Sequence, residues 1–208
     1  MGKWEYGEAY KRYDMDDLIK AGTGVVKVHN IFEPLPEIMM QADCIFCDPP
    51  CSKGNLTSFY TKADRTDYPN SYMLFAERLF ECLDEIAPDT VFLEVFASNR
   101  DYFMEQCKAR FPYVREYATT YYHKTANKCW IIQASHTTNA VYPFEGMDEE
   151  NVIEYICAKH PYNCIGDLCM GRGLVGFYAN KYKRYFVGTE LNKKRLAVLL
   201  ERIENGKL

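Results

Sequence analysis

The segment Asp48-Pro49-Pro50-Cys51 offers the clearest chemistry in this sequence. It places a carboxylate, two prolines and a thiol directly after the apolar run 43–47. The carboxylate would act as a hydrogen-bond acceptor that orients an amine, whereas the thiol would act as a covalent nucleophile. Because proline fixes φ, the segment is stiff and holds the Asp48 carboxylate and the Pro49 carbonyl toward one point. The rest of the chain must decide between these two chemistries.

A glycine turn close to the C-terminus is the second candidate site. An apolar strand is expected to end at Asp167, the turn Gly171-x-Gly173 opens a helix, and a second strand ends at Glu190. Glycines let the backbone approach a ligand at a helix N-terminus. An acidic residue about 20 positions later can accept hydrogen bonds from ribose hydroxyls. The third glycine of a dinucleotide site is missing, so the unit favours S-adenosylmethionine, which has a ribose but no pyrophosphate.

Short β-rich runs alternate with helical patterns along the chain. This alternation predicts an α/β fold, with a mostly parallel sheet and helices on both faces. Ligands bind at the carboxyl ends of strands in such sheets, where the polar connections 51–70 and 135–147 are expected. The predicted strands are 25–29, 43–47, 90–96, 115–122, 128–134, 162–167 and 184–189, and the predicted helices are 71–86, 148–160, about 173–183 and 192–206.

Composition limits the class of protein. The 208 residues, 48% of them hydrophobic, suit a single domain, residues 1–208, without a separate target-recognition domain. The nine cysteines, the polar start and the lack of a long apolar run favour a cytoplasmic, reducing compartment and no membrane contact. A net charge of -4 restricts any nucleic-acid contact to local basic groups. Candidates are Lys53, Lys62, Arg65, His123, Lys124, Lys128, Lys181, Lys183 and Arg184.

Three motifs resemble those of DNA amino-methyltransferases. The run from Asp167 to Gly173, DLCMGRG, resembles their D-P-F-x-G-x-G cofactor motif, and FVGTELN, which contains Glu190, resembles the motif that follows it. Asp48-Pro-Pro-Cys51 is similar to their catalytic D-P-P-Y motif. The catalytic motif precedes the cofactor motif, which is the permuted order of the β class. The resemblance implies a Rossmann-like class I methyltransferase fold with seven strands, S-adenosylmethionine as cofactor, and methylation of adenine N6 in DNA.

The resemblance also implies roles for individual residues. Asp48 and the Pro49 carbonyl would orient the target amine so that its lone pair attacks the sulfonium methyl group, with Pro50 and Cys51 completing the catalytic motif. Asp rather than Ser before the two prolines favours adenine over cytosine. The implied cofactor-binding residues are Asp167, Cys169, Gly171, Gly173, Glu190, Leu191, Asn192, His29 and Asn30, and the implied substrate-binding residues are Lys53, Asn55, Phe59 and Tyr60.

The thiol of Cys51 supports a competing interpretation. Asp-Pro-Pro-Cys-Ser also resembles the D-A-P-C-S motif of RNA cytosine-C5 methyltransferases, in which the cysteine attacks the pyrimidine ring. In that family the cofactor motif comes first, and its second motif, T-C-S, is absent here. A metal site at Cys44, Cys47 and Cys51 is disfavoured, because the spacing reverses that of radical S-adenosylmethionine enzymes. The four histidines share no metal-ligand spacing.

Two departures from the family pattern bear on substrate and partners. Cys51 stands where the family has an aromatic residue that stacks on the target base, and we expect Phe59 or Tyr60 to replace that aromatic. The missing recognition domain predicts help from a homodimer mate or a partner subunit. The alternatives to an enzyme acting on adenine in DNA are an RNA N6-adenine or DNA N4-cytosine enzyme, and a non-catalytic cofactor-binding subunit.

Overall fold

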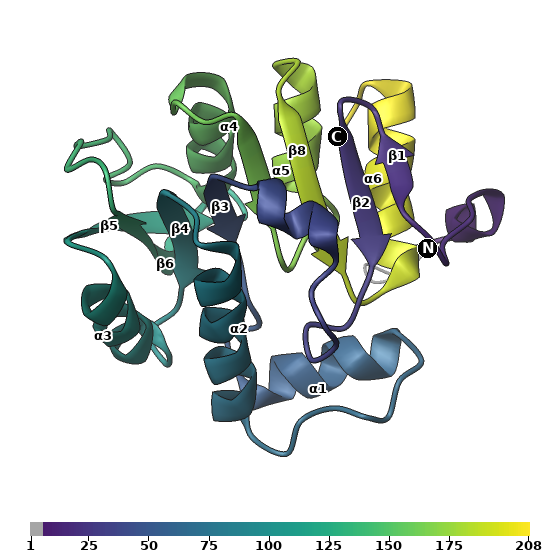
Figure 1. Cartoon of the computed structure of the whole chain (residues 1–208), viewed down its shortest axis with the longest axis horizontal. Helices are drawn as coiled ribbons and strands as arrows, with labels where there is room; N and C mark the ends of the chain where they lie inside the picture. Colours follow the sequence, from purple (N-terminus) through teal and green to yellow (C-terminus); the bar gives the residue numbers. More distant parts are fainter. Residues whose placement is uncertain (1–5) are drawn as a thin grey trace.

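The computed structural model describes residues 6–208, and its eight strands form one sheet in the order β1-β2-β8-β7-β3-β4-β6-β5 (Figure 1). The five strands from β2 to β4 in this order run parallel, while β1, β6 and β5 add antiparallel pairings. The strands are β1 Ile19–Ala21, β2 Gly24–Val28, β3 Cys44–Cys47, β4 Thr90–Val95, β5 Tyr113–Tyr121, β6 Lys124–Ser135, β7 Cys164–Asp167 and β8 Tyr185–Glu190.

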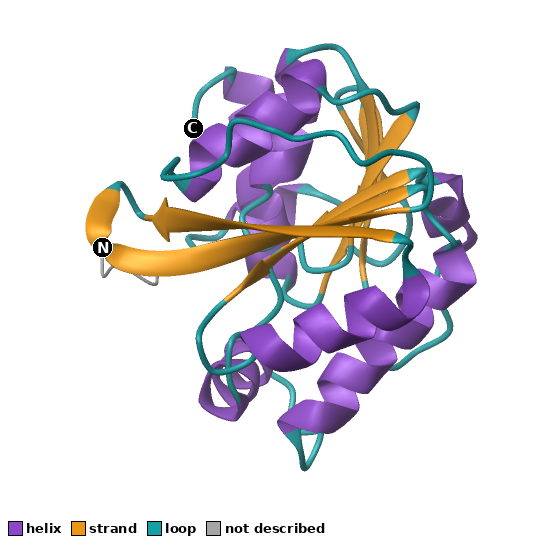
Figure 2. Ribbon diagram, turned by 90° about the vertical axis from the view of Figure 1, so that its left-hand side faces the viewer, coloured by secondary structure: helices purple, strands orange, loops and turns teal. Residues whose placement is uncertain are grey.

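Helices cover both faces of this sheet, as predicted (Figure 2). They are α1 Lys53–Lys62, α2 Tyr72–Ile86, α3 Arg100–Arg110, α4 Glu149–Lys159, α5 Leu174–Lys181 and α6 Lys193–Asn205, with short 3-10 helices at Ala9–Arg12 and Glu37–Gln41. One apolar core joins α1, α2 and α3 to the sheet, and a second core joins α4, α5 and α6 to it. The expected Rossmann-like class I fold is thereby confirmed.

The expected number of seven strands is wrong, because β1 adds an eighth. This strand has three residues and pairs antiparallel with β2 at the edge of the sheet. The connecting turn depends on Gly22, whose φ is +57° and whose missing Cβ would lie 2.1 Å from the Asn180 side chain. So short a strand carries no readable hydrophobic alternation.

The predicted helix boundaries hold where a side chain caps the helix. Ser71, Asp148 and Asn192 each accept a backbone N–H of the first turn, and Gly206 ends α6 with φ at +63°. Two helices lie outside the prediction: α3, and α1 in the stretch 51–70, expected to be a loop. Within α2, Leu74 is exposed, although its apolar side chain predicts a place on the buried face.

The parallel strands bring the candidate residues to one edge of the sheet. Asp48 directly follows β3, Asp167 ends β7 and Glu190 ends β8, while Glu94 lies one residue before the end of β4. Because parallel strands present their carboxyl ends on the same side, these four acids surround one region. The nine cysteines are free thiols, and no helix within residues 6–208 is long and apolar enough to cross a membrane.

Candidate functional site

A cavity of about 590 Å³ lies at the carboxyl edge of the sheet, a size typical of cofactor and small-molecule pockets. Its walls include Asp48 from the Asp-Pro-Pro segment and Asp167, Gly171 and Glu190 from the glycine-turn unit. The two candidate sites of the sequence therefore form one site. The other predicted residues that line it are Pro50, Cys169, Leu191, His29, Asn30, Phe59 and Tyr60.

The Glu190 carboxylate organises the glycine turn. Its Oε2 accepts the backbone N–H of Gly171 at 2.6 Å, and its Oε1 accepts the N–H of Asn192 at 2.9 Å. Gly171 has φ at +56°, so the left-handed conformation of the turn favours glycine. Each carboxylate oxygen has two lone pairs, so the contacts with the two amides leave acceptor capacity for hydroxyl groups of a ligand.

Gly173 and Asn192 shape the turn from outside the cavity. Gly173 has φ at +75° and packs against α6, where a Cβ would lie 2.6 Å from Leu199. Asn192 caps α6 and donates to the Lys62 carbonyl at 2.9 Å, which ties the turn region to α1. Both residues support the glycine turn rather than line the cavity.

The side chain of His29 presents an unpaired atom in the cavity wall. Its Nε2 is buried and has no hydrogen-bond partner within residues 6–208. Burial lowers the pKa of His29, so the neutral ring is favoured at neutral pH. The adjacent Asn30 is already engaged, because its Oδ1 accepts the Tyr60 hydroxyl at 2.7 Å. His29 is therefore available to a ligand, whereas Asn30 holds Tyr60 in place.

Asp48 lines the cavity, and its side chain is exposed to solvent there. Burial among protein atoms and the charge of Glu149 raise its pKa to about 7, although the charge of Arg195 partly opposes this effect. The group is therefore poised to be a carboxylate slightly above neutral pH and an acid slightly below it.

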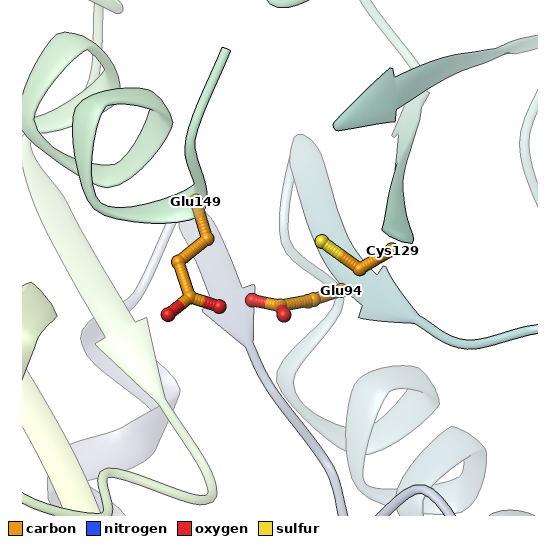
Figure 3. A group of neighbouring side chains, drawn as sticks. All are labelled: Glu94, Cys129 and Glu149. Atoms are coloured by element: carbon orange, nitrogen blue, oxygen red, sulfur yellow. The ribbon is translucent and has the colours of Figure 1, made fainter. Parts of the chain in front are cut away.

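Two further acids, Glu94 and Glu149, face one another in the same wall (Figure 3). Glu94 is only 1% exposed, and burial together with the charges of Asp48 and Glu149 raises its pKa well above the usual range. Burial also raises the pKa of Glu149. The sequence analysis missed both residues, since Glu94 is hidden in an apolar strand and Glu149 resembles an ordinary first-turn acid.

Solved structures with a similar fold include a DNA methyltransferase and a putative DNA modification methylase. The M1.HpyAVI complex with S-adenosylmethionine matches 85% of this chain and 98% of its own at 12% identity, with a TM-score of 0.58. TTHA0409 from Thermus thermophilus, complexed with S-adenosyl-L-methionine, is 12% identical. The match covers 81% of this chain and 90% of that chain, with a TM-score of 0.57. PvuII DNA methyltransferase, which is cytosine-N4-specific, is 9% identical. The match covers 90% of this chain and 94% of that chain, with a TM-score of 0.56.

The chain has the class I methyltransferase fold. Its sheet carries eight strands, as described above. No protein-family model matches the sequence, and no curated protein is significantly similar to it. At such low identity, the match concerns the fold, and the roles of individual residues must be argued from the site itself.

On this class I scaffold, Cys51 lies beside the cavity rather than in its wall. Its Sγ is 3.2 Å from Asn55 Oδ1, which also accepts the Ser52 hydroxyl at 2.7 Å. Burial raises the pKa of Cys51, so the thiol form is favoured. Lys53 and Asn55 are in the first turn of α1, and neither lines the cavity; Pro49 does not line it either.

The aromatic residues expected to stack on a base have other partners. Tyr60 is 2% exposed and fixed by its bond to Asn30, so it cannot swing toward a substrate without breaking the core. Phe59 lines the cavity with the Arg195 guanidinium 4.8 Å from its ring centroid. Arg195 is mostly enclosed, and its Nε is buried without a hydrogen-bond partner within residues 6–208. Phe59 and Arg195 thus form one wall as a stacked pair.

Tyr122, at the turn between β5 and β6, is the aromatic residue that the sequence analysis overlooked. It lines the cavity, yet the residue is 58% exposed. Tyr122 and His123 both have positive φ, and the His123 N–H donates to Asp148 Oδ2 at 2.7 Å. The backbone of Tyr122 also hydrogen-bonds the Glu149 carboxylate. The N-terminus of α4 therefore holds this turn over the cavity.

Proposed function

We propose that this protein is an S-adenosylmethionine-dependent amino-methyltransferase that methylates the N6 amine of adenine in DNA. The observation that carries the proposal is the shared cavity, which joins the Asp48 carboxylate to the glycine turn organised by Glu190. A methyl donor held at that turn and an amine held at Asp48 would meet in one enclosed space. The class I fold, and its similarity to DNA methyltransferases, support this assignment.

The cofactor proposal depends on the chemistry of the wall. Glu190 offers acceptor capacity for ribose hydroxyls, and Gly171 lets the Arg195 guanidinium pack close to the backbone of the turn. His29 Nε2 offers a buried polar atom without a partner within residues 6–208. Two of the similar structures, M1.HpyAVI and TTHA0409, were solved with S-adenosylmethionine bound, which supports the same cofactor here.

In the proposed reaction, Asp48 orients the amine rather than attacking the base. Its carboxylate accepts one N–H, which draws the nitrogen lone pair out of conjugation with the ring. The Pro49 carbonyl, expected to accept the other N–H, does not line the cavity and would have to turn toward it. The lone pair then forms the N–CH₃ bond as the S–CH₃ bond breaks, and the bonding electrons remain on sulfur. The amine nitrogen becomes cationic and loses one proton, which the Asp48 carboxylate, with a pKa of about 7, can accept.

Two observations bear on the target base. The Asp-Pro-Pro segment favours adenine through its family resemblance, whereas the similar PvuII enzyme is specific for cytosine N4. Methyl transfer from labelled S-adenosylmethionine to mixed DNA and RNA, followed by nucleoside analysis, tests the assignment directly. We expect N6-methyladenine in DNA. N4-methylcytosine would correct the target base, and the absence of any transfer would favour a non-catalytic subunit.

Tyr122 is proposed as the stacking partner of the extruded base. A base in duplex DNA must leave the helix to reach Asp48, and it then needs a flat surface to replace lost stacking. Tyr122 is accessible and lines the cavity, whereas Tyr60 is locked in the core. Burial and the charges of Glu149 and Asp48 raise the pKa of Tyr122, which is consistent with a ring that leans over the acids.

Replacing Tyr122 with alanine is expected to raise the KM for DNA about five- to a hundredfold. Stacking of a base on an aromatic ring contributes about 1–3 kcal/mol, which gives this range. Tyr113→Ala is the matched control, because Tyr113 is an exposed tyrosine in β5 that does not line the cavity. Cofactor affinity, measured by calorimetry, should be unchanged in both variants. An unaltered KM in Tyr122→Ala would remove Tyr122 from the substrate site.

Replacing Cys51 with serine is expected to leave methyl transfer within a few-fold of the natural protein. The thiol lies outside the cavity wall and favours its protonated form, so it is poorly suited to attack a pyrimidine. A DNA or RNA substrate with 5-fluorocytosine should give no covalent adduct, as judged by mass spectrometry of the protein. Loss of activity in Cys51→Ser together with a trapped adduct would establish cytosine-C5 chemistry instead.

Recognition of a DNA sequence is proposed to need a second chain. The acidic net charge restricts DNA contacts to local basic loops, and Lys53, at the start of α1, is exposed beside the Asp-Pro-Pro segment. A homodimer mate or a partner subunit would then supply the contacts that choose the site. Light scattering of the protein with and without DNA measures this association.

A further inference from the structure

Glu94, Cys129 and Glu149 converge from three separate elements of the fold. Glu94 comes from β4, Cys129 from the adjacent β6 and Glu149 from the first turn of α4. Their carboxylate and thiol ligand atoms all lie within 4.8 Å of one another. In Figure 3 the two carboxyl groups point toward each other, and the Cys129 sulfur lies beside Glu94.

The Glu94 carboxyl group is buried against Glu149 and the Cys129 thiol, neither of which supplies a positive charge, and one of its oxygens is unpaired within the described chain. Its side chain is 1% exposed, and Oε1 accepts no hydrogen bond from any residue between 6 and 208. Within residues 6–208, no ion pair involves Glu94 or Glu149. The nearby ion pairs of His123 are formed with Asp148 and Glu150 instead. An uncompensated buried carboxylate is strongly unfavourable, so either a proton or a cation must lie between the two acids.

From this convergence we propose that Glu94, Cys129 and Glu149 bind a divalent transition-metal ion such as Zn²⁺. A single proton would compensate one carboxyl group, whereas a divalent ion compensates both. The Cys129 sulfur lies within 4.8 Å of a carboxylate oxygen of each acid, so as a thiolate it would add a third ligand. Two carboxylates with one thiolate favour zinc or a similar borderline metal over Mg²⁺ and Ca²⁺, which prefer oxygen ligands alone.

The surroundings allow the ion to enter and to complete its coordination. Glu94 and Glu149 both line the large cavity, so an ion can enter from that side and keep a water molecule on it. The Thr119 hydroxyl is 3.1 Å from the Cys129 sulfur and can donate to a thiolate as an outer partner. The bound ion would connect β4, β6 and α4 in the cavity wall next to Asp48. Because the Tyr122 backbone hydrogen-bonds the Glu149 carboxylate, an ion held by Glu149 would also fix the turn that carries Tyr122.

Metal titration of the whole chain tests this site without cofactor or nucleic acid. A negative result would therefore reject the metal site and leave the proposed methyl transfer untouched. The chelator-treated protein is titrated with Co²⁺ and with Zn²⁺, and bound metal is counted by elemental analysis after gel filtration. We expect one ion per chain, a sulfur-to-cobalt charge-transfer band in the near ultraviolet, displacement of Co²⁺ by Zn²⁺, and no competition by Mg²⁺. No uptake would mean that the acids share a proton, which would overturn the proposal.

Matched variants locate the bound ion. Glu94→Gln and Glu149→Gln should each weaken binding at least tenfold, about the smallest loss expected even from an outer partner. Cys129→Ser should remove the charge-transfer band. Cys157→Ser and Glu154→Gln are the controls, because they change a buried thiol and an acid on α4 that lie outside the cluster. Cys129→Ser changes one atom and should fold normally even if the acid variants do not. Unchanged metal binding in Cys129→Ser would place the metal elsewhere and overturn the proposal.

Discussion

Replacing Asp48 with alanine is expected to reduce methyl transfer by about 100-fold or more, while affinity for S-adenosylmethionine stays within a few-fold. The carboxylate lies in the cavity and, in the proposed reaction, accepts an amine N–H that strengthens as the nitrogen attacks. Removing an oriented acceptor that acts in the transition state typically costs a factor of this size. Single-turnover methyl transfer, together with calorimetry of cofactor binding, measures the two quantities separately.

Asp48→Asn is the control that separates charge from shape. It keeps the size of the side chain but cannot become a carboxylate, so we expect nearly the same loss as in the alanine variant. Because the pKa of Asp48 is about 7 without a bound ion, kcat/KM of the metal-free protein should fall as pH drops through 7 and level off above it. Activity within a few-fold of the natural protein in both variants would exclude Asp48 from the reaction.

Replacing Glu190 with alanine should do the reverse and weaken cofactor binding by about ten- to a hundredfold. Hydrogen bonds to a charged group contribute about 1.5–3 kcal/mol, which corresponds to this range. The structure adds a second cause, because the variant also leaves the Gly171 and Asn192 amides without their acceptor. The loosened turn would hold a ligand less well even where Glu190 does not contact it.

Comparison of Glu190→Ala with Glu190→Gln distinguishes the two causes. The glutamine variant keeps an acceptor oxygen for one of the two amides and loses the charge and the second acceptor, so it should retain more of the thermal stability than the alanine variant. Isothermal calorimetry gives the affinity, and thermal unfolding reports the integrity of the turn. Full affinity in both variants would show that the cofactor does not bind at this βαβ unit.

The fold could be predicted where a pattern reflects a strong local constraint. Ser71, Asp148 and Asn192 cap helices because their side chains reach orphan backbone amides, and such caps are visible in the sequence. The helix α1 was missed because KGNLTSFYTK buries only Leu56 and Tyr60, which is too little to give a clear apolar stripe. Its cap, Ser52, is visible but has no periodic run behind it.

The site was predicted to the extent that family motifs mark it. Asp48, Gly171 and Glu190 meet because parallel strands share a carboxyl edge, so strand order alone brings them together. Glu94 was missed because a fully buried strand appears in the sequence as one apolar run. A single acid within such a run does not indicate that its side chain faces a ligand cavity. Tyr122 was missed because its position depends on a left-handed turn docked onto α4, a long-range contact that no local pattern encodes.

The order of the strands also has a consequence for how the chain folds. The strands β7 and β8 lie in the middle of the sheet but come from the last quarter of the sequence. Until they are present, β1-β2 and β3-β4-β6-β5 have no strand to join them, and β2 and β3 each keep an open edge. During synthesis, two incomplete sheets must therefore wait with unpaired edges, which is the situation in which chains aggregate or recruit chaperones. The same two strands carry Asp167 and Glu190 into the cavity wall, so the ligand site is completed only when the last quarter of the chain has joined the sheet.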